Sequence, residues 1–249
     1  MPENLLKRTG EIVVSAPEGC EIAPIAIALT QKNSKGEIPA AKGVWTFDEA
    51  ENMLANSGTA EYTMQPGRMN GANVTMVDIT GAGIQQIEGP TTENNAIFLP
   101  KDILLNMQFA TTSGDKIRNY TIMYDVREEK NNNFNALLQP NLANTSDAMF
   151  FINEKAQIGV HAGGNWGYSG YVYAERWHRI IITVKDGVPN AYLDGKLVTP
   201  GKNDYNGAWC LNQEGCYLFA DNDGERMNFE VAEIRYWDEP LSTMQVAAL

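Results

Sequence analysis

The stretch E-R-W-H-R-I-I-I-T-V-K-D-G-V-P-N-A-Y-L-D-G-K, residues 175–196, constrains the fold of this chain more than any other segment. Residues 177–184 are rich in β-branched side chains, which suit the pleated surface of a strand. Because side chains of a strand alternate between its two faces, one face should carry His178, Ile180, Ile182 and Val184. Asp-Gly pairs at 186–187 and 194–195 supply the positive φ angles of tight turns. The segment therefore predicts a β-meander.

His178 is one of two histidines in the chain, and it directly follows Trp177. A histidine with acidic neighbours can act as a general base, and aspartates do occur in the turns that follow it. On an aliphatic strand face, however, a structural role is the simpler interpretation. We expect a buried or rim histidine with one hydrogen bond.

Short strand candidates recur along the chain between clusters of Gly, Asn and Asp. They lie at residues 44–47, 73–79, 96–99, 120–127, 135–139, 148–153, 156–162, 216–220 and 229–237. Only two segments have a helical pattern, residues 100–106 and the final L-S-T-M-Q-V-A-A-L, where Ser242 can cap one turn. Many short strands with this punctuation predict an all-β sandwich or barrel.

Residues 1–42 differ from the rest of the chain. Strand-like stretches at 11–16 and 22–29 are followed by the polar, Gly- and Pro-containing segment 31–43. We interpret residues 1–42 as a leading segment, either the end of a preceding module or an added edge strand. Residues 43–249 are then long enough for one β domain with a substantial core.

Charge limits the classes of partner. The chain has 19 basic and 31 acidic residues and a net charge of −12, so its field should repel phosphate backbones and anionic membranes. We therefore expect no nucleic-acid partner. No apolar run reaches the roughly 18 residues that span a bilayer. The N-terminal M-P-E-N-L-L-K-R-T-G also lacks the apolar core of a signal peptide, which fits a cytoplasmic protein and equally the mature region or a fragment of an exported one.

Three cysteines, Cys20, Cys210 and Cys216, are too few for a disulfide scaffold. Cys210 and Cys216 flank a short loop, so a bridge between hairpin arms and a pair of buried thiols both remain open. We expect the two to lie within bridging distance, with Cys20 unpaired. Such a bridge would stabilise the fold by roughly 2 kcal/mol.

From Gly43 onward, short motifs follow one another in an order that resembles a known family. They are W-T-F-D (45–48), N-S-G (56–58), Y-T-I-M-Y-D-V-R (120–127), I-G-V (158–160), E-R-W-H-R-I-I-I-T-V (175–184), A-Y-L-D-G-K (191–196), L-F-A-D-N-D-G-E (218–225) and V-A-E-I-R-Y-W-D-E-P-L-S (231–242). The order is similar to that of the concanavalin A-like jelly roll, in its laminin-G-like and pentraxin-like branch. The resemblance covers residues 43–249 and implies a sandwich of two antiparallel sheets. It also implies that Trp177 and His178 determine the fold and are not catalytic.

Enzymatic chemistry has weak support in the sequence. Glycosidases of the fold that the chain resembles carry Glu-x-Asp-x-Glu on one strand, and the comparable spacing here is Asp221-x-Asp223-x-Glu225. Because N-D-G at 222–224 favours a turn, we expect these carboxylates to be scattered to different faces. The chain has no Gly-x-Ser-x-Gly motif, and His161 and His178 are too few for zinc. We expect a protein that is not an enzyme.

Calcium is the one metal that the sequence supports. The resemblance implies a calcium site in a loop at the sandwich edge, and carboxylates are suitable ligands. The candidates are Asp48, Asp221 and Asp223. Many relatives have an aspartate before the Glu of the last strand, whereas this chain has Ala232 before Glu233.

Aromatic residues in and after a Gly-rich loop indicate a carbohydrate platform. Rings that lie on loops can stack on the C–H-rich faces of sugars. The candidate residues are Trp166, Tyr168, Tyr171 and Trp209. The alternative is that Tyr171 and Tyr173 are strand residues that pack on a sheet face.

The sequence as a whole favours a non-catalytic carbohydrate-binding or adhesion module of a secreted or cell-surface bacterial protein. Its partner would be a glycan or polysaccharide. Two alternatives stay open, a protein-interaction or structural spacer domain without a sugar site, and a glycoside hydrolase.

Overall fold

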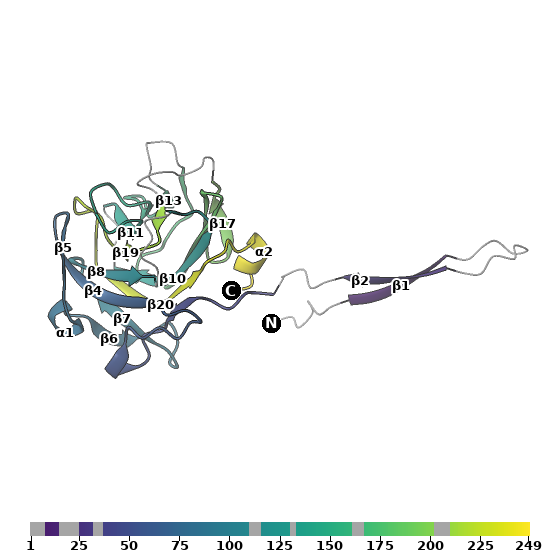
Figure 1. Ribbon diagram of the computed structural model, residues 1–249, viewed down its shortest axis with the longest axis horizontal. Coiled ribbons are helices and arrows are strands. Elements are labelled where there is room, and N and C mark those ends of the chain that lie inside the picture. The colour runs from purple at the N-terminus through teal and green to yellow at the C-terminus, as the bar shows by residue number, and fades with distance from the viewer. Residues whose placement is uncertain are drawn as a thin grey trace, which may run out of the picture.

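The computed structural model describes residues 8–14, 25–31, 37–109, 116–129, 133–160, 167–201 and 210–249. Two eight-stranded sheets, both antiparallel, dominate the described chain and pack face to face (Figure 1). This arrangement confirms the all-β jelly-roll sandwich that the sequence predicts. Among the described residues, no helix has the length and apolar character needed to cross a bilayer.

The first sheet has the strand order β17-β16-β15-β10-β20-β7-β6, and β3 also pairs with β20. Its strands are β3 (Gly43–Trp45), β6 (Gln85–Glu88), β7 (Asn95–Leu99), β10 (Tyr120–Glu128), β15 (His178–Lys185), β16 (Val188–Leu193), β17 (Lys196–Thr199) and β20 (Phe229–Trp237). The long strand β10 lies between β15 and β20, at the centre of this sheet.

The second sheet has the order β14-β13-β12-β11-β19-β8-β4-β5. Its strands are β4 (Thr63–Asn70), β5 (Asn73–Met76), β8 (Ile103–Gln108), β11 (Asn135–Gln139), β12 (Phe150–Ile152), β13 (Ile158–Val160), β14 (Tyr168–Ser169) and β19 (Cys216–Leu218). A separate short ladder joins β9 (Lys116–Ile117) to β18 (Leu211–Asn212).

The helical pattern over residues 100–106 is wrong, because this segment enters strand β8. The first five residues of β8 are all buried, and the strand pairs with β4 on one side and β19 on the other. A strand covered on both faces has no alternation of apolar and polar side chains, so its apolar run resembles that of a buried helix.

The predicted meander is confirmed. Strands β15, β16 and β17 follow one another through turns in which Asp186, Gly187, Asp194 and Gly195 all have positive φ. Ile180, Ile182 and Val184 point into the core between the sheets, whereas Ile181 belongs to a different cluster. His178 is also buried, with 7% of its surface exposed.

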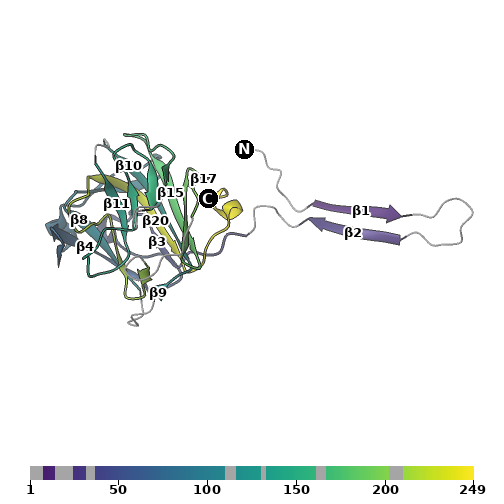
Figure 2. The same ribbon diagram turned by 90° about the horizontal axis from the view of Figure 1, so that it is seen from above.

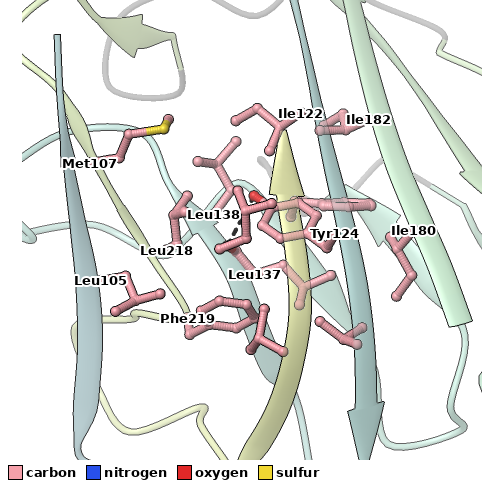
Figure 3. Close-up of a cluster of buried hydrophobic side chains, with 14 of the residues drawn as sticks. Leu105, Met107, Ile122, Tyr124, Leu137, Leu138, Ile180, Ile182, Leu218 and Phe219 are labelled. Carbon is pink, nitrogen blue, oxygen red and sulfur yellow. Dashed lines mark hydrogen bonds between the residues drawn. The ribbon is translucent and has the colours of Figure 1, made fainter. Parts of the chain in front are cut away.

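The core between the sheets is formed by side chains from both layers (Figure 3). Leu105 and Met107 of β8 lie opposite Ile122 of β10, with aliphatic side chains from β11 and β15 around them. The Tyr124 hydroxyl donates a 3.3 Å hydrogen bond to the Leu137 carbonyl, which pairs a buried polar group across the two sheets (Figure 3).

A smaller cluster covers the outer face of the first sheet. Met123, Ile181 and Trp237 lie in it beneath α2 (Thr243–Val246). Ser242 caps α2, and a reciprocal contact from Gln245 completes a capping box, which confirms the predicted helical turn. The other short helices are η1 (Ala50–Asn52) and α1 (Ile79–Ala82).

Strands β1 (Arg8–Val14) and β2 (Ile25–Gln31) form an antiparallel hairpin that extends away from the sandwich (Figures 1 and 2). Within the described chain, neither strand pairs with either large sheet. Residues 37–42, expected in the leading segment, lie on the sandwich instead. The Trp237 indole N–H donates a 2.9 Å hydrogen bond to the Pro39 carbonyl, and Ala41 is buried beside it.

Of the two alternatives for Cys210 and Cys216, the structure has the pair of buried thiols, with no bridge between them. Both side chains belong to the apolar core between the sheets, where a thiol packs as a small hydrophobic group. Burial raises the pKa of the Cys216 thiol, which makes it unreactive. Cys20 lies outside the described residues.

Deleting residues 1–36 is expected to change the melting temperature by no more than about 2 °C, because β1 and β2 pair only with each other. Deleting residues 1–42 should lower it by roughly 5 °C or more, since Trp237 loses its Pro39 acceptor and Ala41 leaves the outer cluster. Thermal unfolding by circular dichroism compares the two deletions. Equal melting temperatures would show that residues 37–42 add nothing to the domain.

Candidate functional site

A loop that follows β14 presents two tyrosines to solvent. Tyr171 is 52% exposed and Tyr173 is 51% exposed, in a protein whose described aromatic side chains are mostly buried. Their ring centroids lie 4.7 Å apart with an edge-to-face geometry. The alternative that both are strand residues packed on a sheet face is therefore wrong, and Tyr173 joins Tyr171 as a candidate for ligand contact.

His178 holds this loop in place. Its Nε2 accepts a 3.0 Å hydrogen bond from the Tyr173 backbone N–H, and its Nδ1 lies 2.9 Å from Asp194 Oδ2. Because Nε2 accepts, the ring proton must be on Nδ1, where it is donated to Asp194. Both ring nitrogens are thus engaged, so the imidazole makes two hydrogen bonds and not the one that was predicted. The imidazole also stacks on the Tyr173 ring at 6.1 Å.

Further contacts restrain Tyr173 more than Tyr171. The Arg176 guanidinium lies 5.2 Å from the centre of the Tyr173 ring. The Arg176 backbone N–H also donates a 3.3 Å hydrogen bond to the Tyr173 carbonyl. Tyr173 is therefore braced by a cation and an imidazole, whereas Tyr171 is the less restrained of two equally exposed rings.

The other predicted platform residues lie elsewhere. Tyr168 is on β14, where its ring packs edge-to-face on Phe134 at 5.8 Å beside a small apolar cluster. Its hydroxyl is buried and has no hydrogen-bond partner among the described residues. Tyr168 is thus drawn inward, away from the exposed pair. Trp166 and Trp209 lie outside the described residues.

Asp221, Asp223 and Glu225 form an acidic cluster, with carboxylate oxygens within 4.8 Å of one another. The expectation that the Asn222-Asp223-Gly224 turn scatters these groups is wrong. Asp221 Oδ2 accepts a 3.0 Å hydrogen bond from the Asp223 backbone N–H, which folds the turn back on itself. Gly224, with φ of 103°, completes the reversal. The turn gathers the carboxylates because it doubles the chain back.

Burial raises the pKa of Glu225 to about 7, with added repulsion from Asp221 and Asp223. Burial likewise raises the pKa of Asp221 to about 6. A hard cation would relieve both effects, and carboxylate oxygens suit calcium. The donor set thus fits calcium, with Glu225 as a third ligand that the sequence analysis did not propose.

Asp48, the third calcium candidate from the sequence, lies outside this cluster. Its Oδ1 accepts a 2.9 Å hydrogen bond from the Asn95 backbone N–H, and its carbonyl accepts one from Gln86. Asp48 thus connects the loop after β3 to strands β6 and β7. In the structure it is a loop-positioning residue.

A second acidic region lies at the end of β10. A cavity of about 440 Å³ is lined by Arg127, Glu128, Glu129, Glu175 and Glu230. Glu128 is only 1% exposed, and neither of its carboxylate oxygens has a hydrogen-bond partner in the part of the chain that the structure describes. Burial raises the pKa of Glu128 to about 7. Nothing in the local pattern marks this residue beyond its position at the end of an apolar strand.

A second cavity, of about 380 Å³, lies on the outer face of the first sheet, where Trp177, Arg179 and Asp194 contribute to its wall. Arg179 forms a two-pronged ion pair with Asp125, at 2.7 and 2.6 Å, and also lies 3.7 Å from Glu233. Its charge is therefore already satisfied by neighbouring strands.

Comparisons with known proteins identify the class of fold. No protein-family model and no curated protein sequence matches the chain. Among solved structures, domain 4 of AbnA, an extracellular GH43 arabinanase from Geobacillus stearothermophilus in complex with arabinotriose, is similar with 14% identity and a TM-score of 0.63. This match covers 85% of this chain and 98% of that domain.

Two further solved structures are similar. The binding domain of botulinum neurotoxin serotype G matches at 13% identity and a TM-score of 0.55, over 84% of this chain and 50% of that one. Trypanosoma rangeli sialidase matches at 13% identity and a TM-score of 0.53, over 75% of this chain and 32% of that one. The chain thus spans about half the length of the toxin binding domain and about a third of the length of the sialidase. At such identities the likeness establishes the β-sandwich fold alone.

Replacing Glu128 with Gln is expected to stabilise the protein at pH 8 and to leave its stability almost unchanged at pH 4. The folded-state pKa of about 7 exceeds the ordinary 4.5, so ionisation costs stability as pH rises between these values. The gain at pH 8 should reach about 3 kcal/mol at most. Urea unfolding at both pH values measures it, with exposed Glu129→Gln as the matched control. An equal gain in both variants would contradict burial as the cause.

Millimolar calcium is expected to raise the melting temperature relative to a chelator, because an ion bound only by the folded state stabilises it. At a hundred times the Kd, this amounts to about 2.7 kcal/mol. Asp223→Asn should remove the shift and Asp48→Asn should retain it, because Asp223 lies in the cluster and Asp48 lies outside it. Scanning calorimetry tests both variants. If calcium does not change the melting temperature of the unmutated protein, the cluster is not a calcium site.

Proposed function

We propose that this chain is a non-catalytic carbohydrate-binding module of a secreted or cell-surface bacterial protein, built on a concanavalin A-like jelly roll of the laminin-G-like type. The observation that carries the proposal is the exposed pair of Tyr171 and Tyr173. Only four large apolar side chains of the described residues are exposed, and two of them are these adjacent rings. Arg176 and His178 brace Tyr173, so this ring loses little conformational freedom when a sugar binds.

The chemistry beside the rings suits sugar hydroxyls. Arg176 lies over the Tyr173 ring and Glu175 precedes it in the same loop, so the loop supplies hydrogen-bond donors and an acceptor besides the rings. Aromatic faces and a few polar groups are the usual components of a small-ligand site. The arabinotriose complex of the similar arabinanase domain and the binding role of the similar toxin domain support the same class of function.

The proposal that the module is not catalytic is supported by the hydrogen bonds of His178, the histidine that lies in the described part of the chain. His178 uses both ring nitrogens to hold Tyr173 and Asp194, so it has no free nitrogen for proton transfer. The imidazole is therefore a positioning residue for the loop.

Glycoside hydrolysis is the rival that one observation favours. Asp221, Asp223 and Glu225 converge, and Glu225 has the raised pKa that a general acid needs. If the unmutated protein hydrolyses a polysaccharide and Glu225→Gln does not, the chain is a glycoside hydrolase. A spacer domain without a sugar site would bind no glycan and hydrolyse none.

Tyr171→Ala is expected to abolish binding on a glycan array while the melting temperature stays nearly unchanged. An exposed side chain contributes within about 0.5 kcal/mol to folding, whereas a stacked aromatic can dominate a binding site. Leu197→Ala is the matched control, since Leu197 is also an exposed apolar residue, at 43%. If Tyr171→Ala retains glycan binding, or if both variants lose it equally, the binding surface does not include Tyr171.

A further inference from the structure

Trp177 differs from the other tryptophans in the described part of the chain. Trp45 and Trp237 are buried, with 0% and 1% of their surface exposed. Trp177 is only half-buried, and it belongs to none of the apolar clusters of the described residues. Packing in the core therefore does not account for the position of this large ring.

Trp177 lies on the outer face of the first sheet. Alternation places it on the same face as Arg179, which is paired in register with Asp125 of β10. The preceding stretch of this face carries Met123 and Ile181, which belong to the cluster beneath α2. The cavity of about 380 Å³, here called the Trp177 cavity, opens beside that cover, because residues from the end of α2 form part of its wall. Its volume falls within the roughly 300–1,000 Å³ of small-ligand pockets.

The walls of the Trp177 cavity combine an aromatic ring with aliphatic surface. The aliphatic lining comes from the loop between β6 and β7, from α2 and from the residues after it, namely Pro90, Val246, Ala247 and Leu249. The Arg127 guanidinium lies 5.3 Å from the centre of the Trp177 ring, and Arg127 Nε donates to Glu230 Oε2. The indole is therefore braced before a ligand arrives. Aromatic and aliphatic walls suit the C–H-rich face of a sugar.

Among the described residues that line the cavity, the polar groups leave acceptor positions open and no cation unpaired. Arg179 binds both oxygens of Asp125, and its Nη1 donates to the Leu249 carbonyl. Asp194 accepts hydrogen bonds from the Arg179 backbone N–H and from His178, each at 2.9 Å. The Asp194 side chain is nevertheless 53% exposed. Because a carboxylate has about four acceptor positions, Asp194 can accept further hydrogen bonds from hydroxyl groups.

These polar groups favour a neutral ligand. An anionic group would meet the open carboxylate of Asp194 and a net charge of −12, while Arg179 is already paired. An organic cation would find the charge of Asp125 neutralised by Arg179. A neutral sugar requires an apolar wall for its ring and acceptors for its hydroxyl groups, and the Trp177 cavity supplies both.

Asp194 connects the Trp177 cavity to the exposed tyrosines. Its Oδ2 accepts from His178, whose Nε2 accepts the Tyr173 backbone N–H and whose ring stacks on that of Tyr173. His178 and Asp194 also line the cavity. The cavity and the tyrosine pair thus adjoin the same two residues, so one glycan chain can contact both.

We propose that the Trp177 cavity is a second carbohydrate subsite, in which a neutral sugar residue packs against the Trp177 ring and donates a hydroxyl hydrogen bond to Asp194. This inference rests on the proposed carbohydrate-binding function, because the same glycan chain contacts Tyr171. Trp177 is thereby assigned to ligand contact, whereas the resemblance of the sequence implied only a role in the fold.

The test uses an array of neutral oligosaccharides of glucose, xylose, mannose, galactose and arabinose, with oligogalacturonate as the acidic comparison. Trp177→Ala should weaken binding of the neutral oligosaccharides about tenfold or more, because a stacked aromatic ring can dominate a binding site. Trp177→Phe should retain most of the affinity. Met244→Ala, at an exposed apolar residue of α2 outside the cavity, should retain all of it. Oligogalacturonate should not bind.

A second measurement decides the matter if Trp177→Ala lowers the melting temperature. The unmutated protein is labelled with 5-fluorotryptophan and followed by fluorine NMR, with Trp177→Phe identifying the Trp177 resonance. The neutral oligosaccharide that binds most tightly on the array should shift this resonance. An unchanged resonance at saturation would overturn the subsite.

The array results separate the subsite from the function on which it rests. If Trp177→Ala binds as tightly as Met244→Ala while Tyr171→Ala loses binding, the subsite is overturned and the carbohydrate-binding function stands. If oligogalacturonate binds as tightly as the neutral oligosaccharides, the assignment of a neutral ligand is overturned. If the unmutated protein binds nothing on the array, the function and the subsite are overturned together.

Discussion

The geometry of the exposed loop depends on the imidazole of His178. One nitrogen is fixed by Asp194, in the turn between β16 and β17, and the other accepts the backbone N–H of Tyr173. The ring thus connects the central meander, which is part of the core, to a loop that has no strand partner of its own. Removing the imidazole would leave the Tyr173 N–H unpaired and free the loop, while the aliphatic face of β15 would persist. The same contact explains why a histidine belongs on an aliphatic face.

The sequence predicted the features that local chemistry specifies. Alternation placed Ile180 and Ile182 in the core, Asp-Gly pairs marked both turns of the meander, and Ser242 marked the start of α2. Each of these depends on residues close together in the chain. The prediction of a helix at strand β8 failed because the strand is buried on both faces by neighbours distant in sequence, β4 and β19. No local pattern reveals such neighbours.

The candidate sites were harder to predict for a similar reason. Turn chemistry at Asn222-Asp223-Gly224 was correctly recognised, but its direction was not, so three converging carboxylates were expected to be scattered. Glu128 gave no signal, since a glutamate that ends a strand usually lies in solvent. Its burial follows from how two sheets close over the end of β10. Tyr171 was found because Gly-rich loops commonly present side chains, and Tyr168 was grouped with it although its ring turns inward onto Phe134.

The hairpin of β1 and β2 has a consequence for how this domain meets other molecules. Seven residues in each strand give an arm of roughly 23 Å, at the usual rise of a strand. Each strand pairs along one side only within the described chain, so both outer rows of N–H and C=O groups stay open. Water can satisfy these rows, and so can a strand from another polypeptide. In the second case a sheet would continue across two molecules, and the arm would set the distance between the sandwich and its neighbour.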